Sequence, residues 1–122
     1  MDLPAMINQM RNHPDFSKAG MVLYHNGVVR DSSRDGRPVT GLTLTVDRKK
    51  LDRIINETRA MPGIVEVLVH INSDMPLMVG DDVMFLAVAG DIREHVIDAL
   101  SLALNRIKTE ATSKTQVFHI NA

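Results

Sequence analysis

The sequence predicts an α+β fold in a single domain, with mixed or antiparallel sheets. The chain has 122 residues, of which 44% are hydrophobic, and this is enough for one ordinary core. Runs rich in β-branched residues alternate with amphipathic segments, in the order helix, strand, strand, helix, strand, strand, helix, strand. No glycine-rich phosphate loop accompanies the central βαβ unit, which argues against a doubly wound nucleotide-binding fold.

The N-terminal part is expected to contain one helix and one or two strands. Residues 3–12 place their apolar side chains on one helical face, and Pro14 ends this helix, so we interpret residues 1–18 as a helical extension. Residues 20–30 then fit two alternatives. They form either a hairpin that turns at Asn26-Gly27 or one strand with Gly27 at a bulge or a close backbone approach.

The middle of the chain is expected to continue with a loop, a strand and a helix. Residues 31–38 are rich in glycine, serine and aspartate and indicate a loop. Residues 40–46 alternate apolar side chains with threonines, which predicts a half-buried strand. Asp47 can cap a helix that ends at Pro62-Gly63.

The C-terminal half is expected to contain three strands and one long helix. Residues 64–71 and 83–89 are rich in β-branched residues and predict two strands. Residues 91–110 predict the helix, and residues 91–94 resemble a capping box with aspartate at the N-cap. A last short strand is expected within residues 116–120.

Two cations lie on the predicted apolar stripe of the long helix. At about 100° per residue, this stripe contains Arg93, Ile97, Leu100, Leu104 and Lys108. Val96, Ala103 and Ile107 widen its apolar side. A buried cation is costly unless it is paired or reaches a polar pocket. For Lys108, the simplest explanation is that its stem lies along Leu104 and its charge suits the C-terminal end of the helix. Arg93 needs another explanation, because the first turn of a helix disfavours positive charge.

These two cations cannot serve one small ligand from a single chain. They are fifteen positions apart, which corresponds to roughly 22 Å along a helix. If two copies of the helix pack antiparallel about a two-fold axis, Arg93 of one copy approaches Lys108 of the other. The sequence therefore suggests a homodimer with two equivalent cationic pockets.

The composition excludes several classes of protein. Lysine and arginine total 14 against 15 acidic residues, and aromatic residues are 3%, which argues against a nucleic-acid partner. The absence of cysteine removes thiol nucleophiles and thiolate metal sites. The N-terminus lacks the pattern of a secretory signal, and no apolar run approaches the length of a membrane span. We therefore expect a cytoplasmic protein with no membrane partner.

Few other residues suggest chemistry. No two of the five histidines have the spacing that puts two imidazoles on one helix face, so no metal site is expected. These histidines are His13, His25, His70, His95 and His119. No serine lies in a Gly-x-Ser-x-Gly elbow. Arg30, directly after a strand, is either a loop cation or an anion ligand, and Arg34 and Arg37 lie in the following loop without an assigned role.

The chain also resembles a known family. Residues 20–30, GMVLYHNGVVR, resemble the segment GAxVxFxGxVR of the large, catalytic subunit of molybdopterin synthase, the MoaE family. Shorter similarities follow in the family's order and extend the resemblance over residues 20–116. They occur at residues 40–44, 67–70, 80–83, 92–93 and 108–111. The specificity of the resemblance comes from this ordered series.

The resemblance implies an α/β hammerhead-type domain, here over residues 1–122, that forms a homodimer without a cofactor or metal. The implied partner is a small ubiquitin-like sulfur carrier of the MoaD type, whose C-terminal Gly-Gly thiocarboxylate enters the pocket. The implied reaction belongs to molybdenum cofactor biosynthesis and adds two sulfurs to cyclic pyranopterin monophosphate to form molybdopterin. Arg30, together with Arg93 from the neighbouring chain, would bind the substrate's phosphate or other oxyanions. Lys108 would hold the carrier's carboxyl group and assist sulfur transfer.

The chain departs from the family at functionally relevant positions. The aromatic residue of the first motif is His25, and the second lysine of the motif KTxAPxWK falls on Thr115. Lys114 can replace that lysine if the segment shifts by one residue. Two hypotheses follow: an active sulfur-transfer enzyme with Lys108 and Lys114 as catalytic residues, or a catalytically impaired dimer that binds anions or regulates. Lys114 discriminates between them by pointing toward Lys108 or away from it.

Overall fold

The computed structural model describes residues 1–119 and contains two three-stranded antiparallel sheets and three α-helices. The predicted α+β class with antiparallel sheets is confirmed. In chain order the elements are α1 (Leu3–Arg11), η1 (Phe16–Lys18), β1 (Met21–Val28), β2 (Val39–Val46), α2 (Arg48–Arg59), β3 (Ile64–Ile71), β4 (Leu77–Met78), β5 (Asp82–Gly90), α3 (Arg93–Arg106), η2 (Ile107–Ala111) and β6 (Thr112–Phe118).

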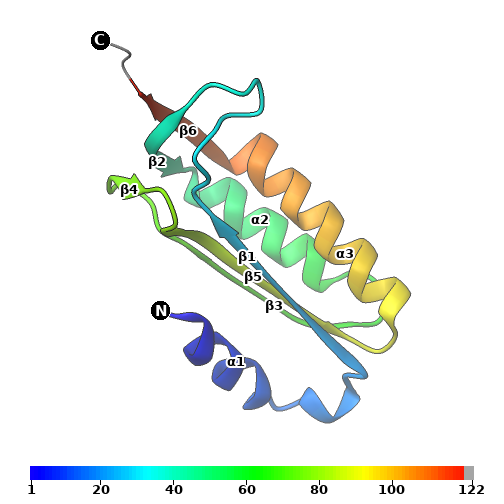
Figure 1. Ribbon diagram of the computed structural model, residues 1–122. Coiled ribbons are helices and arrows are strands. Elements are labelled where there is room, and N and C mark those ends of the chain that lie inside the picture. The colour runs from blue at the N-terminus through cyan, green and yellow to red at the C-terminus, as the bar shows by residue number, and fades with distance from the viewer. Residues whose placement is uncertain (120–122) are drawn as a thin grey trace.

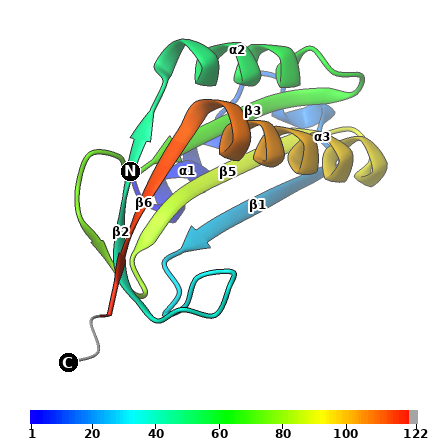
Figure 2. The same cartoon turned by 90° about the horizontal axis from the view of Figure 1, so that it is seen from above.

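The larger sheet has the order β1-β5-β3 and carries helices on both faces. Figures 1 and 2 show α2 and α3 side by side on one face and α1 on the other. The main core lies under α2 and α3, and it contains Leu86 and Val88 of β5 together with Ile54 of α2 and Val96 of α3. A smaller core lies under α1, where Met6 and Met10 pack on the opposite face of the sheet. The alternation of β5 between these two cores explains why it is buried almost throughout.

The smaller sheet has the order β4-β2-β6 and lies at one end of the larger sheet (Figure 1). Residues of β6 from Thr112 to Phe118 pair with β2, so the chain returns after the last helix to its own middle segment. The two-residue strand β4 was not predicted, because Leu77 and Met78 are too short a run to give a pattern. The predicted final strand lies two to four residues too late, and its last residue, Ile120, lies outside the described residues.

Asn26-Gly27 does not turn the chain. β1 continues through both residues and pairs with β5 along its whole length, with a register shift between Gly27 and Val28. The single-strand alternative is therefore confirmed and the hairpin alternative is wrong. Asp47 does cap α2, because its carboxylate accepts a hydrogen bond of 3.1 Å from the Lys50 amide.

The predicted capping box of the long helix is wrong. The N-cap residue of α3 is Ile92, which supplies no side-chain hydrogen bond. Asp91 instead bonds the Ile92 amide and the His95 ring, both at 2.7 Å. The hydrogen bond from His95 lowers the pKa of Asp91. The carboxylate therefore stabilises the turn before the helix and does not reach the amide at the third helical position.

The predicted apolar side of α3 is confirmed in part, because Val96, Leu100, Ala103 and Ile107 are buried. The buried face contains Val96, Ala99, Leu100 and Ala103, with Ile107 continuing it into η2. Of the predicted stripe, Arg93, Ile97 and Lys108 are exposed and Leu104 is half-buried. The two cations therefore avoid the cost of burial by lying on a flank of the helix.

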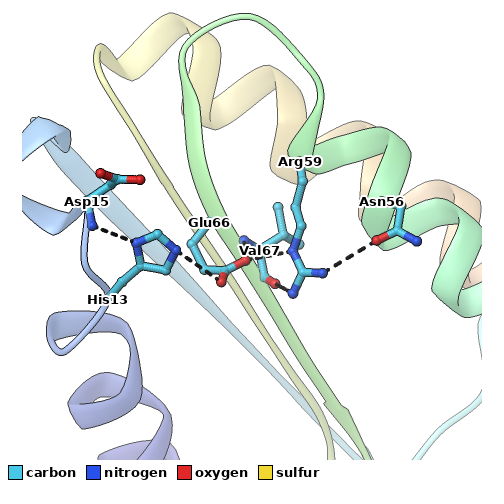
Figure 3. A network of polar contacts seen from close by, with 6 residues as sticks. All are labelled: His13, Asp15, Asn56, Arg59, Glu66 and Val67. Carbon is cyan, nitrogen blue, oxygen red and sulfur yellow. Dashed lines mark hydrogen bonds and ion pairs between the residues drawn. The ribbon is translucent and has the colours of Figure 1, made fainter.

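A polar network ties the N-terminal segment to the larger sheet (Figure 3). Glu66 of β3 pairs with Arg59 at 2.7 Å and with His13 at 3.4 Å. Arg59 also donates to the Val67 carbonyl at 3.0 Å, and the Asp15 amide donates to His13. Because the Glu66 side chain is only 16% exposed, these partners replace water in stabilising its negative charge.

No helix within residues 1–119 is long and apolar enough to cross a membrane.

We expect Glu66→Gln to lower the free energy of unfolding by about 1–3 kcal/mol, because it removes the negative charge that pairs with Arg59 in a partly buried site. Urea denaturation measures this change. Glu94→Gln is the matched control: it breaks the exposed pair with Arg93 and should change stability by less than about 0.5 kcal/mol. Equal effects of the two substitutions would contradict the network's role.

Candidate functional site

Lys108 lies in a π-helical turn between α3 and β6. The α-helix ends at Arg106, four residues earlier than predicted, and residues 107–111 form the wider turn η2. Ile107 and Ala111 of this turn are buried in the main core, while Lys108 is exposed. The Thr112 hydroxyl donates to the Ile107 carbonyl at 3.2 Å and joins the turn to β6. Single π-helical turns often occur at functional sites.

β6 brings Lys114 to the same place. Successive residues of a strand point to opposite sides, so Thr112, Lys114 and Gln116 share one side and Thr115 lies on the other. Thr112, Lys114 and Gln116 all line cavities of the site, and Thr115 lines neither of those described below. Lys114, opposite Leu44 of β2, is therefore the lysine that accompanies Lys108.

Two adjoining cavities, each of about 340 Å³, lie between the end of the larger sheet and the smaller sheet. We call them the apolar cavity and the polar cavity. Both cavities are lined by Lys108, Lys114, Arg34, Val28 and Leu42. The other residues of the apolar cavity are mainly apolar, namely Leu44, Ile71, Val83 and Met84, together with His25, Gly27 and Thr112. The polar cavity is completed by Arg30, Ser32, Ser33, Val39 and Gln116.

Four cations line these cavities. Within residues 1–119, Arg30, Arg34, Lys108 and Lys114 form no ion pair, and no aspartate or glutamate lines either cavity. Arg30 is oriented by a hydrogen bond of 2.7 Å from its Nε to the Ser32 carbonyl. Unpaired cations around a cavity create a positive potential that favours anionic ligands.

His25 contributes an unpaired polar atom to the apolar cavity. Its Nε2 is buried and has no hydrogen-bond partner among residues 1–119. Gly27 lies beside the ring, since a Cβ there would be in van der Waals contact with Nε2 at 3.4 Å. Burial lowers the pKa of His25, and the positive charge of Lys108 lowers it further. A neutral imidazole thus lies within the electrostatic range of Lys108.

Arg93 is not part of this set. It lies at the opposite end of α3, where its Nε contacts Glu94 at 3.2 Å, and its side chain is 78% exposed. The structure therefore brings together Arg30, Lys108 and Lys114, but not Arg93. Residues 1–119 also contain no cluster of three or more histidine or acidic side chains that could hold a metal ion.

A family model described as MoaE protein matches residues 1–110. The chain belongs to the MoaE family. This membership places the chain in molybdenum cofactor biosynthesis, among enzymes of the molybdopterin synthase type. The matched range includes Lys108, whereas Lys114 lies beyond it.

Solved MoaE structures have the same fold. Molybdopterin cofactor biosynthesis protein E from Burkholderia multivorans is 26% identical, with a TM-score of 0.76, over 100% of this chain and 87% of that chain. Molybdopterin synthase from Staphylococcus aureus is 24% identical, with a TM-score of 0.72, over 85% and 78% of the two chains. A complex of subunits 1 and 2 of the molybdopterin-converting factor from Helicobacter pylori is 14% identical, with a TM-score of 0.73, over 98% and 80%. No match was found among curated proteins.

Two residues of this MoaE site, His25 and Arg34, are not predicted from the sequence. His25 differs from the family's aromatic residue, and Arg34 lies in a loop-like segment. The alternation of β1 could have identified His25, because His25 and Gly27 share one side of the strand. No local pattern could have identified Arg34, because its position depends on how residues 31–38 fold.

We expect acidification to destabilise the wild-type protein more than it destabilises the His25→Phe variant. Because the pKa of His25 is lowered by folding, the unfolded chain binds more protons, and stability is lost as the pH falls through about 6.5. The free energy of unfolding should therefore drop less in His25→Phe between about pH 7.5 and about pH 5.5. Urea denaturation at several pH values measures this difference. Parallel profiles for the two proteins would contradict the burial of a neutral His25.

Proposed function

We propose that this MoaE-family protein transfers sulfur from a thiocarboxylated small carrier to cyclic pyranopterin monophosphate and so forms the dithiolene of molybdopterin. The observation that carries the proposal is that Lys108 and Lys114 line the same two cavities. The alternative, an impaired dimer that only binds anions, would have gained support from a Lys114 turned away from Lys108. The opposite arrangement supports the enzyme.

The chemistry of the four cations fits this reaction. A thiocarboxylate and a phosphate are both anions, and each needs positively charged donors in a partly desolvated site. Lys108 can orient the carrier's terminal group, act as acid or base, or form a transient covalent link. Arg30 has the planar fork that suits phosphate. Lys114 lies beside both and can neutralise charge that develops as sulfur is transferred.

The surroundings of the cavities are consistent with a protein partner. Large apolar side chains are exposed on the strands and turns that border the site, at Val28, Met78, Val79 and Val117. Val28 also lines both cavities. Apolar side chains beside a polar pocket are typical of a surface that binds another protein. A carrier tail that ends in Gly-Gly is narrow enough to enter such a pocket, because glycine has no side chain.

We further propose that the protein acts as a homodimer in which Arg93 reaches the site of the partner subunit. Arg93 and Lys108 lie at opposite ends of the α3–η2 segment, which separates them by roughly 22 Å. Arg93 is exposed and next to Ile92 and Ile97, whose side chains are 49% and 46% exposed. This apolar flank supports packing against a second copy of the chain.

Lys108→Ala should lower the rate of dithiolene formation roughly a hundredfold or more, as expected for loss of an acid, base or nucleophile. The assay combines the protein with thiocarboxylated carrier and pyranopterin precursor. Lys18→Ala removes an exposed lysine outside both cavities and is the matched control. Normal turnover in Lys108→Ala would contradict the assigned role, and an inactive wild-type protein with a competent carrier would favour the anion-binding alternative.

A heterodimer of Lys108→Ala and Arg93→Ala chains tests the shared site. If each site takes Lys108 from one chain and Arg93 from the other, the heterodimer contains one intact site and should have about half of the wild-type activity. Co-expression with two different affinity tags isolates this species. A heterodimer as inactive as its parent homodimers, or a strictly monomeric wild-type mass in solution, would contradict the proposed arrangement.

A further inference from the structure

The loop that carries Arg34 is a fixed hairpin. The Val39 amide donates to the Asp31 carbonyl at 2.9 Å, and the Ser33 amide donates to the Arg37 carbonyl at 2.9 Å. The chain reverses at Gly36, which has a φ of 84° that favours glycine. Residues 31–39, which we call the Arg34 hairpin, are therefore held by their own backbone, although the sequence indicated only a loop.

A side-chain contact attaches the hairpin to β6. The guanidinium carbon of Arg37 lies 3.7 Å from the centre of the Phe118 ring, a short cation–π contact. The His119 amide also donates to the Pro38 carbonyl at 3.1 Å. Because β6 carries Lys114, this attachment fixes the hairpin relative to the lysines of the site.

Arg34 lines both cavities. Asp35 is its nearest acid in sequence, but this carboxylate bonds the Ser33 hydroxyl, which lowers the pKa of Asp35 and keeps it charged. Within residues 1–119, Arg34 has no ion pair of its own. The same hairpin supplies the Ser32 carbonyl that orients Arg30. Two guanidinium groups are thus brought to the polar cavity by one preformed element.

The family resemblance already implies that Arg30 binds the phosphate of the pterin substrate. We infer that Arg34, which no motif assigns, completes a clamp with Arg30 within one chain, so that the phosphate lies in the polar cavity and the ring in the apolar cavity. This inference rests on the proposed function for the identity of the substrate. Guanidinium groups bind phosphate through paired charge-assisted hydrogen bonds, whereas the aliphatic wall of the neighbouring cavity suits a flat ring.

The two-cavity arrangement also explains the position of the lysines. Lys108 and Lys114 line both cavities, so they lie where the two halves of the substrate meet. A phosphate held by the Arg34 hairpin would fix the rest of the substrate beside them. Arg34 is thus a substrate-binding residue and Arg37 is a positioning residue, because Arg37 acts by holding the hairpin on Phe118.

Titration of the full chain with inorganic phosphate, followed by NMR chemical shifts, tests the clamp without any need for turnover. Arg34→Ala should weaken phosphate binding about tenfold or more, as expected for loss of charge-assisted hydrogen bonds. Arg34→Lys should restore only part of the affinity, because it keeps the charge but not the planar fork. Arg48→Ala, an exposed arginine at the start of α2, is the matched control and should bind phosphate like the wild type.

Steady-state kinetics then separate binding from chemistry. Arg34→Ala and Phe118→Leu should raise KM for the pterin severalfold and leave both kcat and KM for the carrier close to the wild-type values. Phosphate affinity in Arg34→Ala equal to that in Arg48→Ala would overturn the clamp even if turnover is normal. Phosphate binding that depends on Arg34 in a protein unable to form the dithiolene would support the clamp and overturn the proposed function.

Discussion

The pairing of β6 with β2 is the interaction on which the site depends. It brings residues 112–118 back to residues 39–46, and these two segments are separated in sequence by the whole α2, β3, β5 and α3 core. Lys108 and Lys114 stand on either side of the point where β6 begins, and the Arg34 hairpin leads directly into β2. One set of strand hydrogen bonds therefore determines the distance between the lysines and the hairpin.

The cost of this arrangement is electrostatic. Four cations around two adjoining cavities repel one another, and within residues 1–119 no carboxylate lies among them to reduce the repulsion. Asp35, the acid next to Arg34 in sequence, is used elsewhere, because it bonds Ser33 inside the hairpin. Because an anion relieves this repulsion when it binds, part of its affinity comes from the preorganised positive field.

Periodicity and cap residues predicted most of the fold, because these signals are local. The Asp47 cap, the strand 64–71 and the helical face of residues 3–12 are all decided by neighbours within a few positions. The π-helical turn at Lys108 and the pairing of Phe118 with Arg37 depend on contacts between distant segments, and sequence patterns do not contain them. For the same reason, the sequence alone does not decide whether position 114 or 115 faces the site. Strand alternation selects Lys114 over Thr115 only once the register of β6 is known.

Two guanidinium groups, those of Arg93 and Arg34, can contribute to the site in different ways. The length of α3 decides the case of Arg93, and the position of the hairpin decides that of Arg34. Arg93 can reach a site only in a second copy, because fourteen residues of α-helix and a π turn place it at the far end from Lys108. Arg34 lies in the same chain as the lysines. Its hairpin is held by its own backbone hydrogen bonds and by the contact of Arg37 with Phe118. If both contribute, Arg34 acts through a rigid element and the partner subunit's Arg93 through the stability of the dimer. Groups that share no contact usually make additive contributions to free energy, so the in-chain and partner contributions to anion binding are separable by combining the two substitutions.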